Sequence, residues 1–147
     1  MKYVNPSPTV DIIIIKGDEV CLIKRKIEPF KERIAIPGGY VDYGETVEET
    51  AIKEAKEETG LNISLKEILG VYSDQQRNPK KHLITTVFIA EAESFNLQGD
   101  HEAEPFWEKI DNVTKIDLAF DHNKIFSDFL IWKEKKQTFW SKKFQVK

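Results

Sequence analysis

Apolar positions along the chain have two spacings, one typical of strands and one typical of helices. β-Branched runs from Val10 to Ile15 and from Val20 to Ile23 predict two strands, and the polar residues between them predict a hairpin. His82 to Ala92 has the clearest strand pattern, and Ile63 to Ser73 is also expected to be extended. These four segments predict a sheet.

Residues 46–60 are predicted to form a helix. Thr46 is a good N-cap, and Glu49 three residues later completes a capping box. Gly60 supplies the left-handed residue that commonly follows a helix end. A narrow stripe of small apolar residues would let this helix lie close to a sheet, and its members are Val47, Ala51 and Ala55.

A second helix is predicted from Asp121 to Glu134, where Ile125, Phe129 and Leu130 give a broad apolar side. Strands before and after one helix, with a long helix near the end, indicate an α/β sandwich. Residues 37–39, Pro-Gly-Gly, predict a turn where backbone carbonyls can approach a ligand without interference from side chains.

Composition narrows the class of protein. A length of 147 residues predicts one domain, residues 1–147. The net charge of −3 gives no support for non-specific binding to nucleic acid. The single cysteine, Cys21, excludes a disulfide framework and, inside an apolar run, predicts a buried thiol. Without a secretory signal or a membrane-spanning run, we expect a cytoplasmic protein with no membrane partner.

The first helix carries the candidate chemistry. Glu54, Glu57 and Glu58 stand at i, i+3 and i+4, so their carboxylates share one face. On a solvated surface such like-charge pairs cost only about 0.2–0.5 kcal/mol each, so an exposed acidic face also explains the triplet. If Glu45 folds back towards them and the carbonyls of the glycine turn join, these oxygens suit Mg²⁺ or Mn²⁺.

Residues 37–61, PGGYVDYGETVEETAIKEAKEETGL, resemble the signature of the Nudix hydrolases, which split nucleoside diphosphates linked to another moiety. Six fixed positions of that signature match, and chance agreement at roughly 7% usage each is of order 10⁻⁷ per start site. The matching residues are Gly39, Glu45, Glu54, Glu57, Glu58 and Gly60. Lys53 stands where the family has arginine, and a lysine lacks the bidentate geometry of a guanidinium.

The resemblance implies the Nudix-type fold, an α/β/α sandwich with a mixed sheet between helices. It implies hydrolysis dependent on Mg²⁺, with Mn²⁺ as an alternative. Glu45 and Lys53 would orient the glutamates. The residues that the resemblance assigns to the metal are Gly38, Gly39, Glu54, Glu57 and Glu58.

Residues 72–82, YSDQQRNPKKH, are similar to a loop of the ADP-ribose pyrophosphatase branch, and depart from it at Gln75, Asn78 and Lys80. This similarity implies cleavage of ADP-ribose, a small nucleotide partner, to AMP and ribose 5-phosphate. The cations in and near this loop can be solvated, or can hold the far phosphate and ribose. The candidates for that contact are Arg25, Arg77, Lys80 and Lys81.

Several alternatives stay open at this stage. In the polar loop at residues 98–105, Glu102 and Glu104 are candidates for the general base by resemblance, or are solvated charges. A nucleoside triphosphate pyrophosphohydrolase would share the signature, and a catalytically weak nucleotide-sugar-binding domain would fit Lys53. The family resemblance is compatible with a homodimer, and the tail from Lys135 to Lys147 would cover its own domain or that partner.

Overall fold

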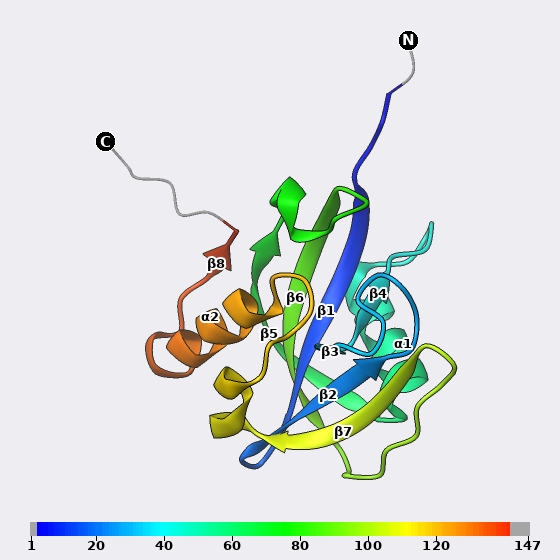
Figure 1. The fold of residues 1–147 in the computed structure, drawn as a ribbon. Helices are drawn as coiled ribbons and strands as arrows, with labels where there is room; N and C mark the ends of the chain where they lie inside the picture. The colour runs from blue at the N-terminus through cyan, green and yellow to red at the C-terminus, as the bar shows by residue number, and fades with distance from the viewer. Residues whose placement is uncertain (1–2, 142–147) are drawn as a thin grey trace.

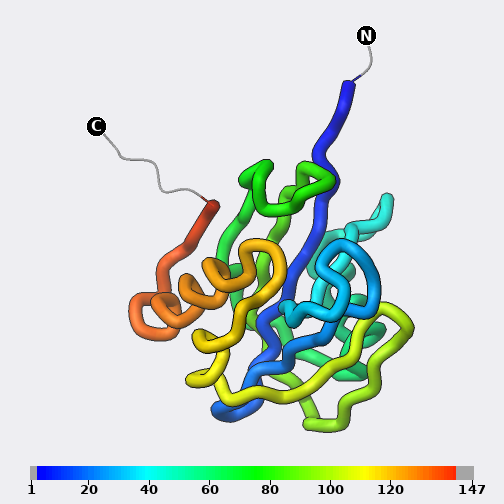
Figure 2. Tube along the Cα trace, viewed as in Figure 1, coloured from blue at the N-terminus to red at the C-terminus, as the bar shows by residue number. Residues whose placement is uncertain are grey.

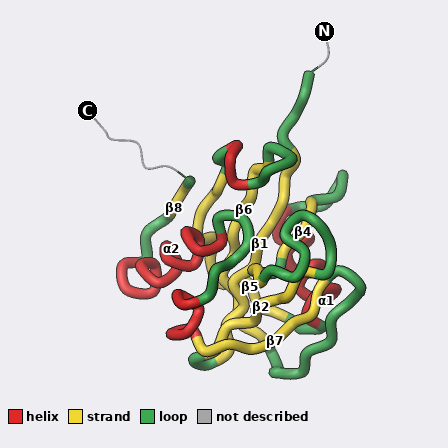
Figure 3. The backbone as a smooth tube through the Cα atoms, in the orientation of Figure 1, coloured by secondary structure: helices red, strands yellow, loops and turns green. Residues whose placement is uncertain are grey.

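The computed structural model describes residues 3–141, which form one mixed β-sheet with helices against both faces (Figures 1 and 3). The strands are β1 (Ser7–Lys16), β2 (Glu19–Arg25), β3 (Ile34–Ala35), β4 (Gly38–Tyr40), β5 (Ile63–Tyr72), β6 (Leu83–Ala92), β7 (Ala103–Lys109) and β8 (Phe139–Trp140). The α-helices are α1 (Val47–Thr59) and α2 (His122–Lys135), and two 3-10 helices are η1 (Gln75–Arg77) and η2 (Ile110–Lys115).

Strand β1 lies in the middle of the sheet, whose order is β3-β2-β1-β6-β5-β8, with β4 also paired to β1 and β7 to β2. β1 runs antiparallel to β2 and parallel to β6, which makes the sheet mixed. Its side chains alternate between the two faces, so Ile12 and Ile14 face α1 while Ile13 faces α2. The predicted α/β/α sandwich is therefore confirmed.

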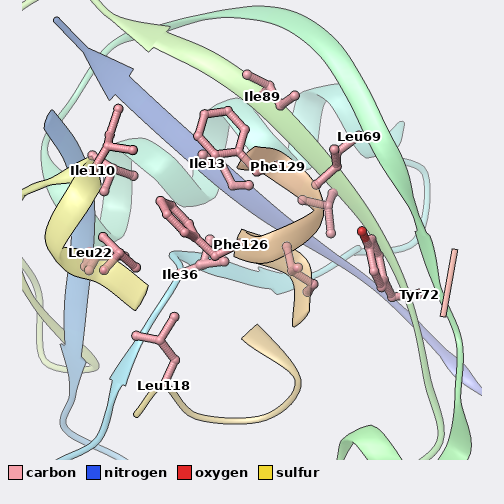
Figure 4. Close-up of a cluster of buried hydrophobic side chains, with 14 residues drawn as sticks. Ile13, Leu22, Ile36, Leu69, Tyr72, Ile89, Ile110, Leu118, Phe126 and Phe129 are labelled. Carbon is pink, nitrogen blue, oxygen red and sulfur yellow. The ribbon is translucent and has the colours of Figure 1, made fainter. Parts of the chain in front are cut away.

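The two helices bury their apolar sides in different ways. On one face, Ala51 and Ala55 of α1 are fully buried, and their small side chains allow close packing on the sheet. On the other face, Phe126 and Phe129 of α2 fill a cluster with Ile13 and residues of the neighbouring strands (Figure 4). Burying a phenylalanine side chain contributes about 1.5–3 kcal/mol, so α2 is held mainly by its aromatic residues.

Most of the predicted elements are confirmed. The first hairpin, the strands β5 and β6 and both helices are present with ends shifted by at most a few residues. Thr46 caps α1 by accepting a hydrogen bond from the Glu49 N–H at 3.1 Å, and Gly60 ends it with φ of +77°. Cys21 is buried, and burial raises the pKa of its thiol to about 12. No helix within residues 3–141 is long and apolar enough to cross a membrane.

Two sequence predictions were wrong. Two residues of the turn predicted at residues 37–39 instead begin β4, because Gly38 and Gly39 pair antiparallel with Asp11 and Val10 of β1. The predicted polar loop at residues 98–105 ends early, because β7 begins at Ala103. β7 pairs with β2 along its whole length, and this tertiary pairing outweighs a sequence with little strand character.

Strand β8 forms one edge of the sheet, where it pairs in parallel with β5. The prediction that the C-terminal tail packs on its own domain is therefore confirmed for the described part of the tail, which ends at residue 141. Phe144 lies outside the described residues. A Cβ atom on Gly70 of β5 would collide with the carbonyl group of Phe139. Glycine is thus required where β8 approaches β5.

We predict that Gly70→Ala separates β8 from β5 and leaves the rest of the sheet intact. Amide hydrogen exchange at Phe139 and Trp140 should rise towards the rate of an unprotected peptide, because their ladder bonds are lost. Val71→Ala is the matched control, since the Val71 side chain is 42% exposed. Unchanged protection of residues 139–140 in Gly70→Ala would contradict this account of the sheet edge.

Candidate functional site

The glutamates of α1 lie against the backbone of β4. Glu58 is only 5% exposed, and its Oε1 accepts a hydrogen bond from the Gly38 N–H at 3.0 Å. A side chain on Gly39 would collide with the carboxylate of Glu54. Gly39 therefore lets β4 approach α1 closely, whereas a Cβ atom on Gly38 would collide with Asp11 and the Val10 carbonyl of β1.

This position is electrostatically unfavourable for the carboxylates alone. Burial raises the pKa of Glu54 to about 7, and the nearby charge of Glu57 contributes to the shift. Burial also raises the pKa of Glu58 well above its usual value, partly offset by the Gly38 N–H. A bound cation would favour the ionised forms of both groups.

The donor set fits a divalent cation by its chemistry. Carboxylate and carbonyl oxygens are the ligands that hard cations such as Mg²⁺ prefer. Within residues 3–141, however, no three Asp, Glu, His or Cys side chains already stand in an arrangement that could hold a metal. Glu57 is exposed, so binding a cation requires its side chain to turn towards Glu54, one helical turn away.

Glu45 and Lys53 form a separate pair. The Nζ atom of Lys53 donates to Glu45 Oε1 at 2.9 Å and to Asp42 Oδ2 at 2.8 Å. Glu45 also accepts from the hydroxyl of Thr50 at 3.0 Å. Glu45 is therefore not folded back onto the glutamate face as the sequence suggested. The pair fastens the loop before α1, and Lys53 acts on Glu54 through its charge, which lowers the pKa of that carboxyl.

The segment between β6 and β7 runs past the C-terminal end of α1 (Figure 2), where the Gln98 N–H donates to the Thr59 carbonyl at 2.9 Å. This contact brings two acidic side chains of the segment towards the glutamates. The charges of Glu102 and Asp100 both raise the pKa of Glu54. Sequence reasoning missed Asp100, because only the packing of this loop on α1 places it there.

The other candidate base lies elsewhere. Glu104 is exposed on β7, where it pairs with Lys24 of β2 in the strand register. Of the two glutamates predicted in this region, Glu102 is the one whose charge acts on Glu54.

A cavity of about 150 Å³ lies on the other side of the two glycines. Arg25 lines it, donates from Nε to the Pro29 carbonyl at 2.7 Å, and stacks its guanidinium 5.0 Å from the centre of the Phe120 ring. Lys81 lies near the same cavity, with its Nζ 5.1 Å from the centre of the Tyr40 ring. Lys80 is exposed on the adjacent loop.

Arg77 has a different environment from the one the sequence suggested. Its guanidinium donates two hydrogen bonds to Asp121, at 2.9 and 2.8 Å, and lies 3.5 Å from Asp11. The side chain is 3% exposed, so its charge is neutralised inside the protein. The sequence predicted an exposed phosphate contact for Arg77 from its loop alone. It gave no sign of the acidic partners, because Asp11 and Asp121 are distant in sequence.

His122 was also missed, although it lies beside the same network. Its Nδ1 accepts a hydrogen bond from the Ile36 N–H at 2.9 Å, so the ring proton is on Nε2, which lies 3.2 Å from Asp11 Oδ2. The neutral imidazole therefore links β1 to the segment that leads into β4. No local pattern in the sequence indicates this role.

An α/β/α sandwich in which the glutamates of α1 lie against Gly38 and Gly39 of β4 is the arrangement expected of a Nudix-type protein. Comparison with known proteins supports this assignment. The model of the NUDIX domain family matches residues 5–129. The chain belongs to the Nudix family.

Two curated relatives cover most of the chain. An ADP-ribose pyrophosphatase of Methanocaldococcus jannaschii is 47% identical over 132 residues, which are 89% of this chain and 77% of that protein. The ADPR responsive transcriptional repressor NtrR of Acinetobacter baylyi is 29% identical over 131 residues, 84% of this chain. The chain spans about half of that repressor, 52% of its length.

Solved structures support the same fold. The MutT/nudix family protein from Enterococcus faecalis has a TM-score of 0.79 and 28% sequence identity, and the match covers 91% of this chain and 64% of that one. The NUDIX domain of Shewanella oneidensis NrtR, complexed with ADP ribose, has a TM-score of 0.77 at 21% identity, covering 92% and 91%. At that identity the second match is evidence for the fold alone.

We predict that Arg77 mainly stabilises the fold. Arg77→Met should cost about 3–5 kcal/mol of unfolding free energy, because it leaves buried carboxylates without their partner. Urea denaturation measures this loss. Lys109→Met is the control, since the Lys109–Asp18 pair at 3.0 Å is exposed and an exposed pair contributes little to stability. Wild-type stability of Arg77→Met combined with weaker substrate binding would favour the phosphate contact instead.

We also predict that pH controls metal binding through Glu54. The folded pKa of Glu54, about 7, exceeds the ordinary value of 4.5, so the metal-free fold binds an extra proton and loses stability as pH rises through this range. The increase in Tm on adding Mg²⁺ or Mn²⁺ should therefore be larger at about pH 8 than at about pH 6.

Glu54→Gln should reduce this pH dependence to the part that Glu58 contributes, while Glu48→Gln, on the exposed first turn of α1, should keep it in full. Differential scanning fluorimetry with EDTA or metal measures both effects. An equal metal-induced shift at both pH values in the wild type would contradict the assignment to Glu54.

Proposed function

We propose that this protein hydrolyses ADP-ribose to AMP and ribose 5-phosphate with a divalent cation. Mg²⁺ is the first candidate for that cation, with Mn²⁺ as the alternative. The observation that carries the proposal is the placement of Glu54 and Glu58 against the backbone of β4, beside a cavity lined by Arg25. The 47% identical relative, named an ADP-ribose pyrophosphatase, supports the choice of substrate. Nudix hydrolases generally need divalent cations, which agrees with this donor set.

In the proposed reaction the residues of α1 and β4 hold the metal. Glu54, Glu57 and Glu58 supply carboxylate oxygens, with the carbonyls of Gly38 and Gly39 as further donors. When bound, the cation supplies positive charge that offsets the diphosphate and activates water. The Gly38 N–H fixes the direction of the Glu58 carboxylate through the bond at 3.0 Å, which limits the reorganisation needed for catalysis.

Other residues position the substrate and accept a proton. Arg25 at the cavity, with Lys80 and Lys81 on the loop beside it, would neutralise the diphosphate that crosses from the cavity to the glutamates. We assign the general base to Glu102 in preference to Glu104, since the charge of Glu102 acts on Glu54. Glu45 and Lys53 would keep the loop before α1 in place.

A second candidate is a nucleotide-sugar-binding domain with weak catalysis. Two observations favour it: Lys53 in place of the family arginine, and the repressor relative at 29% identity. Hydrolysis of nucleoside triphosphates would use the same glutamates and differ in how the rest of the substrate is held.

The test incubates the purified protein with ADP-ribose, nucleoside triphosphates and nucleotide sugars, with Mg²⁺, Mn²⁺ or EDTA, and separates products by chromatography. Metal-dependent AMP from ADP-ribose is expected. Turnover of triphosphates alone would replace the proposed substrate. A tight ADP-ribose complex without product would favour the binding domain, and Lys53→Arg would then be tested for recovered activity.

We predict that Glu57→Gln lowers kcat by about 100-fold or more, because it removes a metal ligand needed in the transition state. The fold should survive, since the Glu57 side chain is exposed. Circular dichroism and Tm check the fold, and Glu48→Gln serves as the control on the same helix. Near-normal turnover of Glu57→Gln would remove the argument for this metal site.

A further inference from the structure

The cavity beside the two glycines contains a polar side chain whose donor is unused. Asn78 lines the cavity and is 7% exposed. Its Oδ1 accepts two hydrogen bonds, from the Lys80 N–H at 2.8 Å and the Lys81 N–H at 3.1 Å. These two donors fix the orientation of the amide, because an NH₂ group could not accept them. No hydrogen bond joins Nδ2 to any of residues 3–141. Since none of their fully buried side-chain nitrogens lacks a partner, Nδ2 reaches accessible space, and Asn78 lines the cavity.

A second donor lines the same cavity. Arg77 donates to the hydroxyl oxygen of Thr85, and Thr85 lies 2.5 Å from the hydroxyl oxygen of Thr9. Thr85 is 1% exposed, and Thr9 is the acceptor within reach of its hydroxyl proton among the described residues. Thr85 therefore donates to Thr9, which leaves the Thr9 proton for a group in the cavity.

The remaining lining suits an uncharged aromatic group. Phe120 and Tyr40 contribute ring surfaces, and the guanidinium of Arg25 stacks on Phe120. The charge of Arg77 is already balanced by Asp121 and Asp11. Apart from Arg25, which the proposed function assigns to the diphosphate, the described residues of the lining offer no cation without an acidic partner, whereas a flat ring with acceptor atoms would meet ring surfaces and two donors.

We propose that this cavity holds the nucleoside end of the substrate and that Asn78 is its specificity-determining residue, donating from Nδ2 to an acceptor atom of the nucleoside. The inference rests on the proposed function, because it places the diphosphate between this cavity and the glutamates. The Asn78 oxygen already accepts from the loop, so only its NH₂ group can bind the nucleoside. Asn78 would therefore donate to an acceptor atom of the base or sugar, and could not accept from an exocyclic amino group.

The experiment uses Asn78→Asp, which keeps the acceptor for the loop and replaces the donor with a second acceptor. The KM for ADP-ribose should rise by about tenfold or more with kcat within about twofold, since the lost contact is made in the ground state and the transition state alike. Calorimetric titration of the unreactive product AMP should show a similar loss of affinity. Inhibition by ribose 5-phosphate should stay unchanged.

Two further variants separate binding from loop structure. Asn78→Ser removes the amide but retains a hydroxyl that can accept from the loop, and it should reproduce the weaker AMP binding if the aspartate variant is unstable. Gln76→Glu adds a negative charge to the same loop at an exposed position outside the cavity. It should leave Tm, KM and AMP affinity close to those of the wild type.

The outcomes are distinct. Weaker competition by ribose 5-phosphate, with AMP unaffected, would overturn the proposal and place the sugar phosphate in the cavity. A lower Tm with unchanged AMP affinity in both Asn78 variants would also overturn it, since Asn78 would then serve the loop alone. If the wild type forms no AMP from ADP-ribose but binds AMP through Asn78, the proposed function fails while this assignment stands.

Discussion

The close approach of β4 to α1 is the constraint on which the candidate site depends. Gly39 has no side chain to keep the strand away from Glu54, and Gly38 has none to collide with β1, so that Glu58 accepts from the Gly38 N–H and Glu54 lies against Gly39. The same two glycines form one wall of the cavity. A single short strand therefore lies between the glutamates of α1 and the proposed nucleoside site.

Charge is arranged differently on the two sides of that strand. Towards α1, Glu54, Glu57 and Glu58 form no ion pair within residues 3–141, and burial raises the pKa of both Glu54 and Glu58. Towards α2, Arg77 is matched by Asp121 and lies near Asp11. The first arrangement favours capture of a cation, whereas the second builds a rigid interior. The proposed cation binding and the stability of the fold thus depend on two different groups of charged residues, the glutamates of α1 and the network around Arg77.

Lys53 illustrates how a departure from the family signature can be accommodated. As a point charge it reaches Glu45 and Asp42 together, and so fastens the loop that leads into α1. It does not need a planar fork for that contact. Lys53 therefore attaches this loop to α1 through a hydrogen bond to Glu45, and acts on Glu54 through its charge.

The sequence by itself determined what depends on neighbours along the chain. Capping residues fixed α1, apolar periodicity fixed the hairpin and the long strands, and helical spacing put Glu54, Glu57 and Glu58 on one face. The tertiary structure alone decided the strand β7, the burial of Arg77 and the contacts of His122. Their partners lie far away in sequence, as with Arg77 and Asp121, so no local pattern records them. Those contacts exist only once the sheet has brought β1, β4 and α2 together.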